Sequence, residues 1–289
     1  MFGKLLKYDL RAVGRLWWIG AAASLVASVL AALLIRFFYS VAESNTESVI
    51  LNIAAILAFF ASFFCMIAVV LAFVFTLILV YVRYYKHFFT DEAYLTFTLP
   101  VKRSTLFFSK IVNAVIWYSL HLAVIVFSVL FFAVLVTPAE KGGFFINFYV
   151  FEAIGQALKD LWLSVGAWLV VYILEALLLF FAYMLYTMLL VHFCITVGAV
   201  LVKKAKILLS IGIYYLVSSA MQVIGQFLFM FIGTFTFEGI FVMMQDAGFH
   251  QTCAVVAFLL MALIGAIFSV ASVLYSLTEQ TLSRKLNLA

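Results

Sequence analysis

Residues 49–82 read VILNIAAILAFFASFFCMIAVVLAFVFTLILVYV, a run of 34 residues without a single charged side chain. A helix needs about 20 apolar residues to cross the hydrocarbon layer of a membrane, and this run exceeds that length. A soluble protein would have to bury the whole run, whereas a membrane protein can expose it to lipid. The run therefore predicts a transmembrane helix that tilts or projects into water at one end.

Five further stretches of the chain are apolar over a similar length. The six predicted spans lie near residues 16–35, 49–82, 111–136, 163–190, 207–232 and 252–277. Charged residues make up 10% of the chain and hydrophobic residues 68%, whereas roughly 25% of an ordinary soluble domain is charged. We therefore expect an all-α membrane protein, with residues 1–289 forming a single transmembrane domain.

The basic residues predict how the chain is oriented. If the N-terminus is inside, 14 of the 17 Lys and Arg residues fall in cytoplasmic segments, and Arg36, Lys141 and Lys159 fall outside. Cytoplasmic segments of membrane proteins are enriched in Lys and Arg. We therefore expect a multi-pass protein of a cell membrane with both termini in the cytoplasm.

The first 15 residues have an amphipathic pattern. Apolar side chains fall on one face of a helix, and basic side chains fall on the opposite face, at Lys4, Lys7, Arg11 and Arg15. The pattern predicts a separate N-terminal helix over residues 1–15, an elbow that lies in the inner headgroup layer before the first span. Asp9 falls within the apolar arc, where burial in lipid does not explain it, so a contact with a partner group is expected there.

Two rows of small residues run along the first span at four-residue spacing, which lets helices approach closely. The rows consist of Ala23, Ala27 and Ala31, and of Ser24, Ser28 and Ala32. They predict either an interface between subunits or close packing within one subunit, and the sequence favours neither.

Three other segments have patterns of their own. Residues 147–161 alternate apolar and polar side chains, as a helix on the outer surface does. Residues 191–202 continue the apolar run of the fourth span and are expected to project below the membrane. Residues 233–250 are apolar but too short for another crossing. They predict a re-entrant segment that dips into the outer leaflet before the last span.

The chain contains none of the common catalytic or nucleotide-binding motifs. GxxxxGK[ST], HExxH, GxSxG and CxxC are all missing, so no catalytic site and no resident metal or cofactor is expected in this chain. Cys65, Cys194 and Cys253 lie inside apolar runs, which favours small buried residues and not a disulfide framework.

Four polar residues within the spans are candidates for a transport pathway. Glu175 is the only acid inside a predicted span, and an acid at that depth is costly unless it is paired or hydrated. His121 is expected at a similar depth, and a Glu175–His121 contact is one hypothesis. A structural hydrogen bond from a protonated carboxyl is the other. Gln222 and Gln226 lie one turn apart and either line a pathway or join neighbouring helices.

Residues 83–110, RYYKHFFTDEAYLTFTLPVKRSTLFFSK, separate the second and third spans on the cytoplasmic side. Thr90 is expected to cap a short helix. The first turn of that helix holds Asp91 and Glu92, whose charges suit the helix dipole. Pro100 ends the helix, because proline cannot continue it.

This short helix carries apolar side chains that are unusual for a loop in water. They are Tyr94, Leu95, Phe97 and Leu99. Their exposure to the cytoplasm would suit insertion into another protein, whereas packing on neighbouring segments or on the membrane surface is the alternative. Ser104 is expected to cap the third span that follows.

The stretch TDEAYLTFTLPV (90–101), followed by KRSTLFFSKIV (102–112), resembles the segment before the third helix of ABC-2 type permeases of Gram-positive bacteria. The order of the predicted elements agrees with that family over nearly the whole chain, including a basic break at 203–206 and an ending like SRKLNL. The resemblance implies that residues 90–100 form a coupling helix that docks on a separate ATPase subunit. It implies a second contact around Lys203 and Lys204, and re-entrant outer helices before the last span.

The resemblance implies the transmembrane subunit of an ATP-binding cassette exporter in a bacterial cell membrane. Two copies, or one copy with a related permease, would stand above two cytosolic ATPases that bind ATP and Mg²⁺. The apolar membrane domain favours a hydrophobic or amphipathic cargo, such as a peptide toxin, an antimicrobial peptide or a lipophilic drug. No nucleic acid is expected as a partner.

Two other functions are compatible with the sequence. The first is a secondary transporter driven by protons through Glu175 and His121, which would work without an ATPase. The second is a membrane sensor or immunity scaffold, which would recruit a partner to the cytoplasmic loop and move no cargo.

Overall fold

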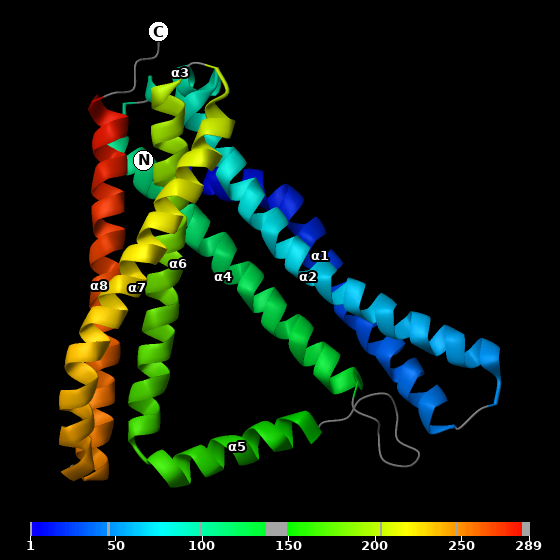
Figure 1. The fold of residues 1–289 in the computed structure, drawn as a ribbon. Helices are drawn as coiled ribbons and strands as arrows, with labels where there is room; N and C mark the ends of the chain where they lie inside the picture. The colour runs from blue at the N-terminus through cyan, green and yellow to red at the C-terminus, as the bar shows by residue number, and fades with distance from the viewer. Residues whose placement is uncertain are drawn as a thin grey trace. The chain divides into compact units, whose positions relative to one another are not determined.

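The computed structural model describes residues 2–44, 47–98, 100–136, 149–202, 204–246 and 248–284, with residues 229, 231–246 and 284 described by their backbone alone. Within these ranges the chain forms eight helices and no strand (Figure 1). The helices are α1 (Phe2–Glu43), α2 (Val49–Phe89), α3 (Glu92–Phe97), α4 (Arg103–Val136), α5 (Tyr149–Val165), α6 (Trp168–Leu201), α7 (Lys206–Asp246) and α8 (Phe249–Arg284).

All of these helices except α3 and α5 are long and apolar enough to cross a membrane. In α7 the stretch that meets this condition is Lys206–Leu228. Six candidate spans therefore confirm the predicted all-α fold and indicate a multi-pass membrane protein. The predicted extension of the fourth span is also confirmed, because α6 continues to Leu201.

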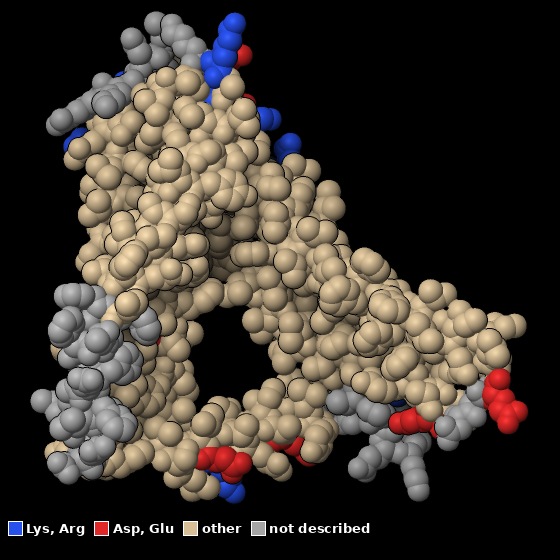
Figure 2. Space-filling model, viewed as in Figure 1, with Lys and Arg blue, Asp and Glu red and all other residues tan. Residues whose placement is uncertain are grey.

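The outer surface of the described helices is largely apolar. Large side chains such as Ile50, Leu216 and Phe258 are exposed along the spans. Figure 2 shows a face made mostly of uncharged residues, with acidic side chains over α5 and near the adjoining ends of α1 and α2. A surface of this kind is stable in contact with lipid and not with water.

The chain divides into two compact units. The first unit comprises Met1–Arg83 and Val112–Ser164, and the second comprises Tyr84–Ile111 and Val165–Ala289. Helices α2 and α4 each contribute one part to the first unit and one part to the second.

In the first unit, α1 packs closely on α2 and α4. A Cβ atom added at Gly20 would lie 3.2 Å from the ring of Phe75 in α2. The Trp17 ring in α1 lies 5.0 Å from that of Trp117 in α4, measured between centroids. These contacts need small residues on α1, because a large side chain at position 20 would separate the helices.

The rows of small residues on α1 are mostly buried within the chain. Ser24, Ala27, Ser28, Ala31 and Ala32 are all buried, whereas Ala23 is exposed. The structure therefore favours packing within one chain for these five residues, and it explains them without an interface between subunits.

In the second unit, α6 and α8 run parallel and α7 runs in the opposite direction (Figure 1). At the start of the parallel pair, the indole nitrogen of Trp168 donates to Nδ1 of His250 (3.1 Å). The Tyr172 hydroxyl donates to the carbonyl of Cys253 (3.1 Å). At the other end α6 packs tightly on α7, because a Cβ atom at Gly198 would overlap the backbone of Ser210.

Two predicted segments are not separate elements. The elbow predicted for residues 1–15 is wrong as a separate helix, because α1 runs unbroken from Phe2 to Glu43. The buried residues Asp9, Val13, Trp17 and Ser24 keep one face through the predicted boundary. The re-entrant segment predicted for 233–250 is also wrong over 233–246. The backbone there continues α7, which contains no proline that would end it.

Several helix ends differ from the predicted boundaries. The third span begins as α4 at Arg103 and not at residue 111. The surface helix predicted for 147–161 is present as α5, Tyr149–Val165, and the fourth span therefore starts at Trp168 and not at residue 163. The break between α5 and α6 is at Gly166, whose φ is +63°.

Replacing Gly166 by alanine is expected to destabilise the break between α5 and α6 by about 1–2 kcal/mol, because a Cβ atom disfavours the left-handed backbone conformation. No neighbouring atom would meet that Cβ within 4 Å, so the cost is conformational. Thermal unfolding of the purified chain in detergent measures it. The control is Gly155→Ala in α5, where the added Cβ also meets nothing. Equal melting temperatures for the two variants would contradict the prediction.

Candidate functional site

The segment between α2 and α4 forms the short helix predicted from the sequence, with bounds Glu92–Phe97. Its capping differs from the prediction. Asp91 is the N-cap residue and makes no side-chain cap bond, while the Thr90 hydroxyl donates back to the carbonyl of Lys86 in α2 (2.6 Å). The predicted Thr90 cap is therefore wrong, because that hydroxyl bonds the preceding helix.

The prediction that Ser104 caps the third span is also wrong. α4 begins at Arg103, so Ser104 already lies inside its first turn. The carbonyl of Lys102 accepts the backbone N–H groups of Thr105 and Leu106, so the helix begins two residues earlier than a Ser104 cap would place it.

The two faces of α3 have different surroundings. Ala93 is buried and Phe97 is half-buried. Tyr94 and Leu95 are 68% and 70% exposed. Tyr94 and Leu95 therefore form an apolar tip, and the other face holds the helix on the protein. Of the other predicted docking residues, Pro100 and Lys204 are exposed, and Leu99 and Lys203 lie outside the described residues.

Arg103 contacts both the C-terminal end of α3 and the C-terminal end of α8. Its guanidinium carbon lies 5.1 Å from the centre of the Phe97 ring, a cation–π geometry. Its Nη1 atom donates to the carbonyls of Leu282 (2.9 Å) and Ser283 (3.0 Å) at the end of α8. A cation at the C-terminus of a helix is also favoured by the helix dipole. The Phe97 ring packs on that of Phe88 in α2, with centroids 5.5 Å apart.

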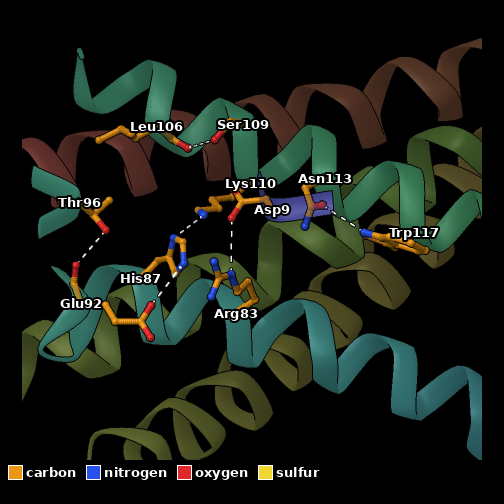
Figure 3. Close-up of polar contacts among 10 residues, drawn as sticks. All are labelled: Asp9, Arg83, His87, Glu92, Thr96, Leu106, Ser109, Lys110, Asn113 and Trp117. Carbon is orange, nitrogen blue, oxygen red and sulfur yellow. Dashed lines mark hydrogen bonds and ion pairs between the residues drawn. The ribbon is translucent and has the colours of Figure 1, made fainter. Parts of the chain in front are cut away.

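A second set of contacts joins the start of α3 to α2 and α4, and Figure 3 shows His87 between Lys110 and Glu92. Nζ of the buried Lys110 lies 2.8 Å from Nδ1 of His87. Nε2 of His87 lies 3.4 Å from a carboxylate oxygen of Glu92. Because an ammonium can only donate, Nδ1 accepts, and a neutral His87 carries its proton on Nε2, toward Glu92. We call this pair of contacts the Lys110–His87–Glu92 relay.

The C-terminal end of α2, which precedes α3, forms hydrogen bonds with other helices of the second unit. The buried Tyr84 hydroxyl donates to Thr196 Oγ1 in α6 (2.6 Å), and Thr196 in turn donates to the carbonyl of His192 (2.8 Å). Nζ of Lys206, the first residue of α7, donates to the carbonyl of Phe89 (3.3 Å). The end of α2 that precedes α3 is therefore bonded to α6 and α7.

Asp9 has an ionic partner that the sequence did not identify. Its carboxylate is buried in the first unit and lies 3.6 Å from Nε of Arg83 in α2 (Figure 3). This contact explains an acid on the apolar face of α1. The signal in the sequence was the combination of Asp9 in an apolar arc and an arginine at the inner end of the neighbouring span.

His121 is buried in the first unit, where its Nδ1 atom has a hydrogen-bonding partner. Its Nδ1 atom lies 2.8 Å from Thr76 Oγ1 in α2. The rings of Phe73 and Trp17 lie 5.6 and 6.2 Å away, measured between centroids. His121 therefore has a structural explanation within its own unit.

Glu175 belongs to the second unit and is buried in α6. Its Oε2 atom has no hydrogen-bond partner among the described residues. The Glu175–His121 pair remains a prediction. Gln222 and Gln226, the other two pathway candidates, are exposed on α7.

The described residues contain no group of three or more His, Cys, Asp or Glu side chains that could hold a metal ion. The three cysteines are free. No protein-family model, curated protein or solved structure matches the chain.

Proposed function

We propose that this chain is the transmembrane subunit of an ATP-binding cassette exporter and that α3 is its docking helix for a separate cytosolic ATPase. The observation that carries the proposal is the apolar tip of α3. Tyr94 and Leu95 are mostly exposed, although burial of such side chains is favourable by about 25 cal/mol per Å². An aromatic residue beside an aliphatic one, on a firmly held helix, suits insertion into a protein pocket.

The attachment of α3 supports a role in transmitting force. Arg103 joins it to α8, and the Lys110–His87–Glu92 relay joins it to α2 and α4. Displacement of α3 by a moving ATPase would therefore displace the ends of three membrane helices together. In the proposed mechanism, closure of the ATPases on ATP moves α3 and switches the pathway between inward and outward access.

The proposal includes the orientation and assembly expected from the sequence. We expect α3 and both termini to face the cytoplasm, in a bacterial cell membrane. Two such chains, or one with a related permease, enclose the pathway. ATP and Mg²⁺ bind to the partner ATPase, and this chain has no catalytic site. The apolar exposed surface favours a hydrophobic or amphipathic cargo, including peptides and lipophilic drugs.

The test is capture of an ATPase from the native host by the tagged chain in a gentle detergent, followed by an assay of ATP hydrolysis. Tyr94→Asp combined with Leu95→Asp is expected to reduce the co-purifying ATPase at least tenfold, because each charge would be buried in the interface. The matched control, Tyr94→Phe with Leu95→Met, keeps the apolar tip and is expected to retain the ATPase.

Wild-type chain that purifies from its host without an ATPase would contradict the exporter function. Transport in vesicles without any ATPase would then favour the proton-driven transporter. Capture of a partner through Tyr94 and Leu95 without cargo movement would favour the scaffold.

A further inference from the structure

Glu175 is turned inward on a part of α6 that is otherwise exposed. Its residue exposure is 5%. The residues from Ile173 to Leu178 other than Glu175 are all exposed. The carboxylate is therefore covered at the contact face of α6, and the exposed side chains on either side of it in the sequence are apolar.

The side chains one and two turns before Glu175 do not supply a donor. Tyr172 gives its only hydroxyl proton to the carbonyl of Cys253. Trp168 gives its indole proton to Nδ1 of His250, so this nitrogen accepts and does not donate. These pairs join α6 to α8 and leave Oε2 of Glu175 without a hydrogen-bond donor among the described residues.

Nor does the sequence offer a counter-charge along these helices. α6 contains no Lys or Arg, and α8 contains only Arg284, its last residue. In α7 the only basic residue is Lys206, the first. Glu175 lies 26 residues before the end of α6, which is about 40 Å along a helix. The cations at that end are therefore too far away to form an ion pair with it.

We propose that Glu175 binds the primary ammonium group of an amphipathic cargo. A buried carboxylate in a membrane is stabilised by a cation that also donates hydrogen bonds, and a primary ammonium provides both. The apolar part of the same molecule would lie along the exposed side chains of Leu174, Leu177 and Leu178. This inference rests on the proposed export function and specifies the chemistry of its cargo: a cationic amine joined to an apolar body.

The experiment uses the full chain in nanodiscs of zwitterionic phosphatidylcholine. The probe is dansylcadaverine, a primary amine on an apolar fluorophore, compared with its neutral N-acetyl derivative. Binding is followed by fluorescence polarisation for wild type and Glu175→Gln. The matched control is Tyr183→Phe, a one-atom change at an exposed position of α6.

Glu175→Gln is expected to weaken binding of dansylcadaverine by about tenfold or more, because glutamine keeps an acceptor oxygen but loses the negative charge that pairs with the ammonium. The N-acetyl derivative and the Tyr183→Phe variant are expected to show no such change. Equal affinity of wild type and Glu175→Gln for dansylcadaverine would overturn the proposal. If Glu175→Gln does not fold, the affinities of wild type for the amine and for its N-acetyl derivative are compared. Equal affinities overturn the proposal, and at least tenfold tighter binding of the amine supports it.

The failure of this inference can be told apart from failure of the proposed function. If the chain captures an ATPase through Tyr94 and Leu95, but Glu175→Gln binds the amine as tightly as wild type does, the inference is overturned. The proposed exporter function is then not affected. Amine binding that depends on Glu175, in a chain that captures no ATPase, would support the site and contradict the exporter function.

Discussion

Alanine in place of Gly198 is expected to separate α6 from α7 and to destabilise the protein by about 3 kcal/mol or more, since overfilling a close contact forces backbone shifts. A Cβ atom at this position would lie 2.8 Å from both the Cα and the N atom of Ser210, and it would also overlap Ser210 Oγ. Backbone atoms cannot rotate away as the end of a side chain can. The melting temperature in detergent is expected to fall on the order of 5–10 °C.

Gly212→Ala is the matched control for this variant. Gly212 lies in α7, on the helix that Gly198 contacts, and a Cβ atom there would meet nothing within 4 Å. Alanine at an open helix position is neutral or stabilising by up to about 1 kcal/mol. A combined Gly198→Ala and Ser210→Gly variant should recover only part of the loss, because the backbone contacts remain. A melting temperature for Gly198→Ala equal to that of Gly212→Ala would refute the prediction.

The second large effect is expected at the Asp9–Arg83 ion pair. The side chain of Asp9 is 4% exposed and that of Arg83 is 27% exposed. Replacing one partner of a buried pair typically costs 3–5 kcal/mol, and the partial exposure of Arg83 puts this pair at about 3 kcal/mol or less. Arg83→Gln should be the more harmful change, because it takes the guanidinium away from a carboxylate that water cannot reach. Asp9→Asn should cost about 1 kcal/mol, since Arg83 can turn toward water.

A double-mutant cycle on thermal unfolding tests this asymmetry. Asp9→Asn added to Arg83→Gln should raise stability above that of Arg83→Gln alone, because it removes the buried charge whose ion pair with Arg83 has been lost. If the two single changes add without interaction, the contact contributes nothing and the prediction fails.

The general fold could be predicted because it depends on the length and polarity of local runs. The charge-free run in 49–82 is sufficient to predict a span in any context, and the apolar continuation of residues 191–202 correctly indicated the extension of α6. The short helix after α2 followed from Asp91 and Glu92 before an apolar segment and from Pro100 after it.

The details that were wrong depend on tertiary contacts. Thr90 was a reasonable cap by residue type, but its hydroxyl bonds the carbonyl of Lys86. The amphipathic pattern over 1–15 indicated a surface helix, whereas its apolar face continues into the buried face of α1. His121 could be identified as a buried polar group, but its partner Thr76 is 45 residues away in the chain. Nothing in a single sequence pairs residues at that separation.

The bonds from Arg103 also determine an order of events during synthesis. The carbonyls that it binds belong to residues 179 and 180 positions later in the chain. At about 5–20 residues per second, the ribosome needs roughly 10–40 s to make the intervening segment. Until α8 is inserted, α3 is without this attachment. The attachment of the helix that carries Tyr94 and Leu95 is therefore completed only after the C-terminal end of α8 has been made, so a chain truncated before α8 would lack it.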